Sequence, residues 1–126
     1  MEIITGTVCE EIVKLRTETK DVVIYLYRNQ LKGVEMENVK VLFRKNDGEV
    51  YAFFPEATAN YGMVMTYAHI GQHGEASLEF YWNSEKATEK EYADLLSELK
   101  SVYNDCALVV RQRMNYNDLR ASWNRR

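Results

Sequence analysis

Residues 88–103, TEKEYADLLSELKSVY, carry the clearest structural pattern in this chain. Thr88 followed by Glu91 fits a capping box, in which each side chain satisfies a free backbone N–H at the start of a helix. The apolar side chains that follow the cap fall on one stripe of the helix, with charged residues opposite, so the segment is amphipathic. The stripe consists of Tyr92, Leu95, Leu96, Leu99, Val102 and Tyr103. Because such a stripe must be buried, the segment predicts a helix that packs on a sheet.

The sheet that this helix requires is predicted from the residues that precede it. Residues 21–27 are dense in β-branched and aromatic side chains, and residues 39–44 alternate between apolar and charged. Asn46-Asp47-Gly48 accepts positive φ, which predicts a hairpin into Glu49–Phe54. Met63–Ala68 and Ala76–Trp82 are predicted to form a further pair of strands.

Shorter elements are predicted after the helix. The apolar run Cys106–Val110 predicts a strand that returns to the sheet, and Asn115 or Asn117 is a candidate cap for a short helix over Asp118–Trp123. The predicted fold class is therefore α+β, with residues 1–126 as one domain. An antiparallel sheet comes from the N-terminal two thirds, followed by a capped helix at about 88–103, a strand at about 106–113 and a C-terminal helix.

Composition narrows the class of protein. With 126 residues, of which 46% are hydrophobic, the chain can bury a core of one domain. The net charge of −3 argues against a general nucleic-acid binder, and no apolar run reaches the roughly 20 residues that a membrane span needs. Cys9 and Cys106 are expected to be small buried residues in a reducing compartment. The N-terminus lacks the pattern of a signal peptide, so a cytoplasmic location is expected.

Both histidines lie in the connection YAHIGQHG, residues 67–74. Polar groups and flexible backbone crowded between apolar strands are typical of a site rather than of a simple turn. His69 and His73 have the spacing of a zinc-binding pair on a helix, but Gly71 and Gly74 argue against a helix, and two histidines leave a zinc site half built. A catalytic role would require a cysteine or serine within reach, which spacing alone does not show. The favoured interpretation is that one histidine caps a turn and the other faces a ligand or solvent.

Two arginines follow the apolar run near the C-terminus. On a strand Arg111 and Arg113 point to the same face. Two adjacent guanidiniums are well suited to bind a phosphate or pyrophosphate, because each offers a planar fork of donors. The alternative is a solvated strand end that pairs with Glu or Asp. Arg44, on the polar face of the first hairpin, either adds to this positive charge or is simply exposed.

Aromatic residues are abundant, with nine tyrosines, two tryptophans and four phenylalanines, and they concentrate in Phe80-Tyr81-Trp82-Asn83. On a strand Phe80 and Trp82 would share one face and Tyr81 would lie on the other. An exposed aromatic ring beside arginines is a usual way to hold a nucleotide, with the base on the ring and the phosphates on the guanidiniums. The alternative is an oligomer interface, where Tyr, Trp and Arg are also enriched.

Three segments, YAHIGQH at 67–73, ATEKEYADLL at 87–96 and VVRQR at 109–113, together resemble small phage-borne proteins of the anti-Thoeris type 1 sponge family. The resemblance covers roughly the C-terminal half and extends loosely over the chain through length and element order. It implies a non-enzymatic sponge that binds cyclic ADP-ribose isomers made by a bacterial TIR defence enzyme. It also implies an oligomer built from dimers, with ligand pockets at protomer contacts; some relatives take up cyclic oligonucleotide signals.

The resemblance further implies a pocket in which an aromatic side chain stacks on adenine and arginines hold the phosphates. Arg111 and Arg113 suit the phosphates, and Tyr81 or Trp82 suits the base. No catalytic residue, metal, cofactor, membrane or nucleic-acid polymer is expected, and the partners are a cyclic nucleotide and further copies of the chain. The predicted ligand-binding residues are Arg111, Arg113, Tyr81, Trp82, Asn83, His69, His73 and Arg44.

Two other functions are compatible with the sequence. A structural or interaction protein that forms a homo-oligomer without a small-molecule ligand explains the aromatic residues and the helix, but it gives the histidine connection no role. A small hydrolase or lyase that acts on nucleotides would use His69 or His73 as acid or base. It has the least support, because no nucleophile is placed beside either histidine.

Overall fold

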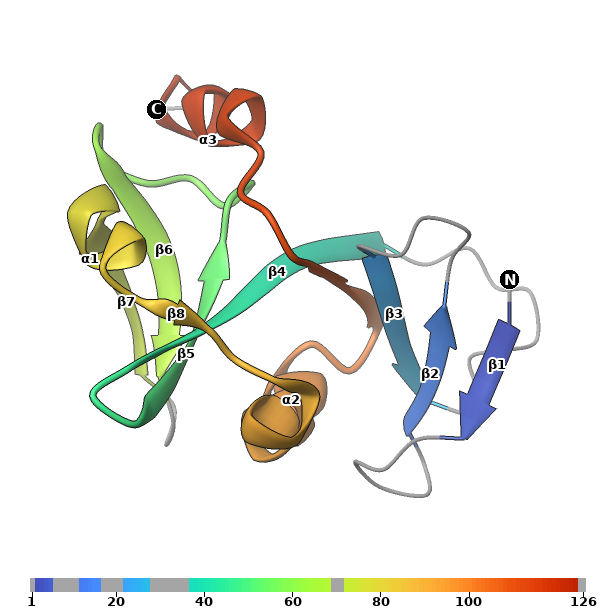
Figure 1. The fold of residues 1–126 in the computed structure, drawn as a ribbon. Coiled ribbons are helices and arrows are strands. Elements are labelled where there is room, and N and C mark those ends of the chain that lie inside the picture. Colours follow the sequence, from blue (N-terminus) through green and yellow to red (C-terminus); the bar gives the residue numbers. More distant parts are fainter. Residues whose placement is uncertain (1, 6–11, 17–21, 28–36, 69–71, 125–126) are drawn as a thin grey trace.

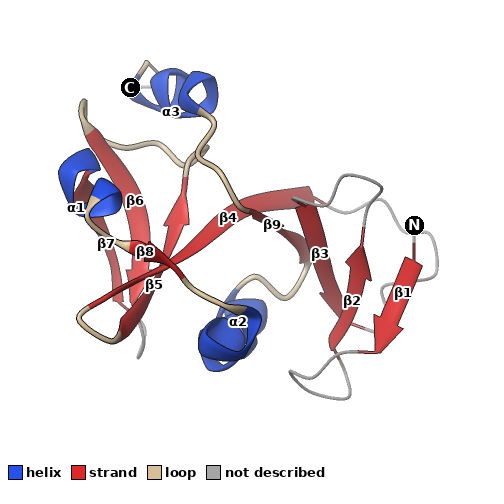
Figure 2. Cartoon of the chain, viewed as in Figure 1, coloured by secondary structure: helices blue, strands red, loops and turns tan. Residues whose placement is uncertain are grey.

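The computed structural model describes residues 2–5, 12–16, 22–27, 37–68 and 72–124. These residues form one mixed sheet and three helices (Figures 1 and 2). The strands are β1 (Glu2–Thr5), β2 (Ile12–Arg16), β3 (Val22–Tyr27), β4 (Glu37–Asn46), β5 (Glu49–Phe54), β6 (Met63–Ala68), β7 (Gln72–Ser77), β8 (Glu85–Lys86) and β9 (Cys106–Arg111). The helices are α1 (Leu78–Trp82), α2 (Glu89–Val102) and α3 (Tyr116–Trp123). The predicted α+β class is confirmed.

The strand order is β1-β2-β3-β9-β4-β5-β6-β7, and the short β8 pairs with β4. The long strand β4 joins the two parts of the sheet. Its first half pairs with β9, up to Val41 opposite Val110, and its second half pairs with β5, from Leu42 opposite Phe53 onward. In Figure 1, β4 accordingly runs from the β1–β3 side to the β5–β7 side.

The predicted returning strand, β9, lies inside the sheet rather than at its edge. It pairs antiparallel with β3 and parallel with β4, which makes the sheet mixed, whereas the strands before it pair antiparallel with one another as predicted. The position of β9 inside the sheet has a physical reason. Residues 106–110 are all buried, and an apolar strand without polar alternation needs cover on both faces. β9 ends at Arg111 rather than at 113, and the sequence did not predict β1 and β2.

The predicted hairpin between residues 46 and 49 is confirmed. β4 and β5 pair up to Asn46 opposite Glu49. The two turn residues both have positive φ, 52° at Asp47 and 80° at Gly48. That conformation matches the right-handed twist of the strands and is one that Asp-Gly adopts at low cost.

The predicted strand Ala76–Trp82 was wrong. The strand is β7, which ends at Ser77, and residues 78–82 form α1. The first residue of the partner strand β6 is Met63, opposite Ser77, so a longer β7 would have no strand to pair with. Ser77 also caps the helix, because its side chain accepts a hydrogen bond of 3.1 Å from the backbone N–H of Phe80.

The capping box at the start of α2 is confirmed. Thr88 accepts from the backbone N–H of Glu91, and the Glu91 carboxylate accepts from the backbone N–H of Thr88. Hydrogen bonds from Lys45 and from Thr88 lower the pKa of the Glu91 carboxyl to about 2. The start of α2 is therefore tied to β4 as well as to its own first turn.

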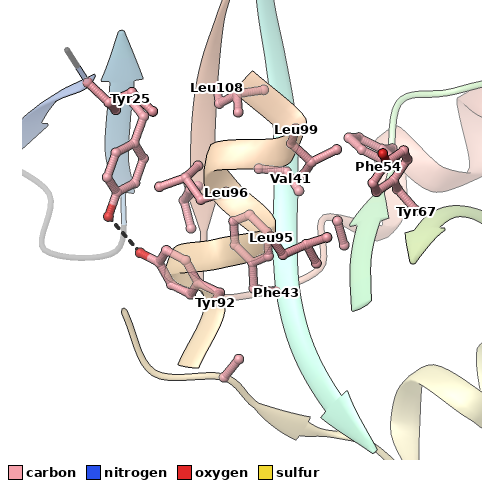
Figure 3. Close-up of a cluster of buried hydrophobic side chains, with 14 residues drawn as sticks. Tyr25, Val41, Phe43, Phe54, Tyr67, Tyr92, Leu95, Leu96, Leu99 and Leu108 are labelled. Carbon is pink, nitrogen blue, oxygen red and sulfur yellow. Dashed lines mark hydrogen bonds between the residues drawn. The ribbon is translucent and has the colours of Figure 1, made fainter. Parts of the chain in front are cut away.

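The apolar stripe of α2 packs against one face of the sheet (Figure 3). Leu96 and Leu99 are fully buried, and the Tyr92 ring stacks on Phe43 with 4.3 Å between ring centroids. The Tyr92 hydroxyl is 2.8 Å from that of Tyr25. Val102, predicted within the stripe, is 48% exposed, because it lies at the edge of the stripe in the last turn.

The opposite face of the sheet is covered by α1 and α3. Its buried cluster joins strand residues to helix residues and comprises Leu42, Phe53, Val64, Tyr81, Met114 and Leu119. Asn115 caps α3, one of the two candidates predicted. None of the helices in the described ranges is long and apolar enough to span a membrane.

The junction between α2 and β9 is held by a buried ammonium group. Lys100 is fully buried, and its Nζ donates to the backbone carbonyls of Tyr103, Asn104 and Cys106. The same Nζ lies 4.4 Å from the centroid of the Tyr27 ring, and burial lowers the pKa of Lys100. Cys106 is a buried free thiol, as expected, whereas Cys9 lies outside the described residues.

Replacing Leu96 by Ala should lower the free energy of unfolding by about 2–5 kcal/mol, because a fully buried leucine leaves a cavity. Val102→Ala is the matched control on the same helix and should change it by less than about 0.5 kcal/mol. Urea unfolding of both variants measures the difference. A loss at Leu96 as small as that at Val102 would show that this face of α2 is not core.

Candidate anion-binding site

A depression of about 360 Å³ lies where β9 leads into α3. Its volume lies at the lower end of the range of small-ligand sites, and it is shallow and widely open to solvent. The lining side chains come from the end of β9, the following loop and the first turns of α3. They are Arg111, Arg113, Met114, Asn115, Tyr116, Asn117 and Arg120, and this depression is called the arginine pocket below.

Local structure explains why these residues converge. Arg111 is the last residue of β9, opposite Val22 of β3, and the chain then leaves the sheet. The Asn115 side chain accepts hydrogen bonds from the backbone N–H groups of residues 117 and 118, which begins α3. Arg120 lies one turn into the helix, and its Nη2 donates to Oδ1 of Asn117 at 2.7 Å. Strand end and helix start thus place three guanidinium groups around one depression.

The arginine pocket is rich in positive charge that no acid in the described part of the chain neutralises. Within the described part of the chain, the guanidiniums of Arg111 and Arg113 have no hydrogen-bond or ion-pair partner. No carboxylate lines the pocket, and the acid of α3, Asp118, binds Lys40 at 3.0 Å. Guanidiniums that stay unpaired at the surface can bind an anion without first giving up a partner, and their planar forks match phosphate oxygens.

Exposed aromatic side chains stand at the rim of this pocket. Trp82, the last residue of α1, is 58% exposed, and its Nε1 donates to the hydroxyl of Tyr116 at 2.9 Å. Tyr116 itself lines the pocket and is 42% exposed. The structure therefore brings together the predicted Arg111, Arg113 and Trp82.

Tyr116 and Arg120 were not predicted as site residues. A signal for them was present in the sequence, since they lie four residues apart just after the candidate cap Asn115, and that spacing places them on one face of a helix. Only their position relative to Trp82, which is set by the packing of α1, has no local signal.

Three other predicted residues lie near the pocket without lining it. Tyr81 is only 6% exposed, and its ring packs edge-on against Phe53 and beneath the Arg44 guanidinium. Arg44 donates to Oγ of Ser84 at 3.0 Å and to the Ser84 carbonyl, so it holds the β4–β8 region together. Asn83 is the exposed C-terminal cap of α1. Tyr81 and Arg44 therefore have structural partners, whereas Trp82 has an open face.

His73 does not reach the arginine pocket. It lies on β7 opposite Tyr67, with its Nε2 3.1 Å from the hydroxyl of Tyr103. That end of the β6–β7 pair is the far one from α3, because Trp123 of α3 donates to the carbonyl of Met63 at the start of β6. His69 lies outside the described residues.

Among the side chains that the structure describes, no group of three His, Cys, Asp or Glu residues could hold a metal ion. Comparison with protein-family models, with curated proteins and with solved structures finds no match for the chain. The family resemblance of residues 67–73, 87–96 and 109–113 therefore stays a prediction.

The arginines should differ sharply in their contribution to stability. Arg44→Ala should lower the free energy of unfolding by about 1–3 kcal/mol, because it leaves the Ser84 carbonyl without its donor. Arg113→Ala should leave it within about 0.5 kcal/mol, because that exposed guanidinium has no partner in the described chain. Thermal or urea unfolding compares the two, and equal losses would mean that Arg113 has a structural role.

Proposed function

We propose that this chain binds a small phosphate-bearing nucleotide in the arginine pocket and sequesters it without changing it chemically. The observation that supports this most directly is the pairing state of the pocket arginines. Arg111 and Arg113 have no partner in the described chain, Arg120 is oriented by a neutral amide, and no carboxylate competes for them. Such an arrangement costs stability through like-charge repulsion unless an anion offsets it.

The aromatic rim supports a nucleotide over a simple inorganic anion. Trp82 and Tyr116 present polarisable ring faces beside the guanidiniums, and bases stack on such faces. Their mutual hydrogen bond limits the freedom of both rings, which lowers the entropy lost when a base settles on them. A phosphate on the arginines and a base on the rim would satisfy both parts of the site together.

The family resemblance narrows this ligand to a cyclic nucleotide immune signal. In the resulting proposal the chain is a phage anti-defence protein that acts in the cytoplasm of the bacterial host. It captures cyclic ADP-ribose isomers, or cyclic oligonucleotides, and keeps them from the defence effector. The protein does not react with the ligand, which is later released chemically unchanged.

Arg111→Ala should weaken binding of a cyclic ADP-ribose isomer by about 10- to 100-fold, because a charge-assisted contact contributes roughly 1.5–3 kcal/mol. Arg111→Lys should also weaken it, since an ammonium lacks the fork of donors. The double variant Arg111→Ala with Arg113→Ala should abolish binding. Titration calorimetry measures all three variants.

The control for these substitutions is Lys90→Ala, which removes one exposed positive charge from α2, away from the pocket. It should bind as wild type does. A double arginine variant that bound as tightly as wild type would place the site elsewhere. A separate incubation with the ligand, followed by heating of the protein, distinguishes sequestration from catalysis. Intact ligand that is released only on heating supports a sponge, and a new product supports an enzyme.

A second candidate function is a structural or interaction protein that forms a homo-oligomer without a small ligand. Three of the four large hydrophobic side chains that the described chain exposes, Tyr61, Trp82 and Tyr116, lie around α1 and α3. Exposed aromatics next to arginines are also typical of protein interfaces. Both candidate functions include assembly into a dimer or a multiple of dimers.

Light scattering at micromolar concentration should therefore give a mass of at least two chains. Double substitution of Arg111 and Arg113 by Ala should leave this mass unchanged if the pocket serves a ligand. Loss of the oligomer in that variant, without any binding of nucleotide by wild type, would favour the interaction protein. A monomer mass for wild type would contradict both the assembly and a pocket shared between protomers.

A further inference from the structure

We propose that the exposed side of α3 is a binding surface for single-stranded nucleic acid. It carries two aromatic pairs, Trp82 with Tyr116 and Tyr61 with Trp123, each called a station below, and the Arg120 guanidinium lies between them. This goes beyond capture of one small nucleotide, and it rests on residues at the far end of α3 from the arginine pocket as well as on the pocket. The surface consists of Trp82, Tyr116, Arg120, Trp123 and Tyr61, and it is called the α3 surface below.

Helical spacing places the central three residues of this surface in one row. Tyr116, Arg120 and Trp123 differ by four and three positions, so they lie on the same side of α3. Leu119 and Ser122, which are fully buried, anchor the helix to the sheet. The row therefore alternates aromatic, cation and aromatic along the helix axis, with Trp123 partly buried against the cluster that contains Leu119.

A second aromatic side chain contacts each of the two aromatic residues of the row. At the first end Trp82 donates to the Tyr116 hydroxyl. At the other end the Tyr61 ring lies 4.9 Å from that of Trp123, measured between centroids, and Trp123 is fixed by a 2.8 Å hydrogen bond to the Met63 carbonyl. Tyr61 is 86% exposed, so most of its ring is open to a partner.

The distance between the two stations suits bases that belong to one strand. Trp123 lies seven positions after Tyr116, which corresponds to about 10 Å along the helix at 1.5 Å per residue. A single small nucleotide bound in the arginine pocket reaches only the first station. A strand that runs along α3 can place successive bases on both, with its backbone over Arg120.

Charge on the α3 surface complements a phosphate backbone. Arg120 lies between the stations, and Arg113 continues the positive charge beyond the first one. Two acids of this region are engaged, Asp118 by Lys40 and Glu75 by the backbone N–H and side-chain amide of Asn60. The net charge of −3 predicted no nucleic-acid partner, but net charge does not report how the arginines are distributed over the surface.

A single strand fits this surface better than a duplex. Stacking on Tyr61 and Trp82 needs bases whose faces are free, and a duplex buries its base faces in its own stack. Contacts from guanidiniums to phosphates and from rings to base faces tolerate any sequence. Recognition on the α3 surface is therefore expected to be strand-selective and largely sequence-independent.

The test uses a fluorescein-labelled oligothymidylate of about 12 nucleotides, a length within the site sizes of single-strand binders. Fluorescence anisotropy at low ionic strength measures binding by the full chain. Trp82 is exposed, and Trp123 is partly buried beside Tyr61, so quenching of tryptophan emission reports stacking on or next to these rings. Wild type should bind the single strand at least tenfold tighter than a duplex of equal length, with quenching.

Tyr61→Ala is the decisive variant, because this exposed ring can be removed without opening the core. It should weaken binding of the oligothymidylate by about 5- to 100-fold, as removal of a stacking aromatic does. Val102→Ala, the control, removes an exposed apolar side chain from α2 and should change nothing. Tyr61→Ala should leave calorimetric binding of a cyclic ADP-ribose isomer unchanged, which separates this inference from the proposed function.

Several results would overturn the inference. Absence of oligothymidylate binding by wild type at low ionic strength would do so, as would unchanged binding in Tyr61→Ala. Equal affinity for duplex and single strand, without quenching, would reduce the surface to a site of general electrostatic attraction. A drop in the mass of the free protein on Tyr61→Ala would show instead that a second copy of the chain covers the α3 surface.

Discussion

Burial of the apolar face of α2 determines where the other elements can lie. Tyr92, Leu96 and Leu99 need an apolar surface wider than one hairpin, and that surface comes from both halves of the sheet. β4 supplies the continuity, because its first half belongs to one part and its second half to the other. A helix packed across this junction holds the two parts of the sheet at a fixed angle, so α2 is the element on which the fold depends.

The position of the arginine pocket follows from the end of the same helix. β9 begins only a few residues after α2, and the buried ammonium of Lys100 binds the carbonyls of Tyr103, Asn104 and Cys106 across that link. A buried charge is tolerable there because it has several acceptors and an aromatic ring. β9 then runs between β3 and β4, and its last residue, Arg111, leads into the loop before α3.

Local signals in the sequence were sufficient for the elements whose causes are local. The Asp47-Gly48 turn and the capping box of Thr88 and Glu91 are decided by neighbouring residues, and both were predicted correctly. The change from β7 to α1 was not predictable in this way. Residues 78–82 have the composition of a strand, and they form a helix because β6 offers no partner beyond Ser77. The insertion of β9 is equally non-local, although its uninterrupted apolar run was a sign of burial on both faces.

The residues of the candidate site were likewise predictable where their cause is local and not where it depends on distant packing. The expectation that Arg111 and Arg113 act together needed only the end of an apolar strand. Which neighbouring aromatic is open to a base, Trp82 or Tyr81, depends on the face that α1 turns toward the sheet. Strand alternation grouped Phe80 with Trp82, whereas in α1 Phe80 packs with Tyr81 against the sheet and Trp82 is exposed. Adjacency to Tyr116 then depends on two helices that meet only in the folded chain.

The chemistry of the two kinds of cation explains how an acidic chain can present a basic surface. Lysines make the ion pairs that tie the elements together, from Lys14 to Glu89, from Lys40 to Asp118 and from Lys45 to Glu91. An ammonium is a compact point charge and suits such pairs, whereas a guanidinium keeps its planar fork whatever it faces. Since the lysines engage these acids, the guanidiniums around α3 remain available at the surface. Net charge alone therefore underestimates what this face of the protein can bind, and the local pairing of each cation is the better guide.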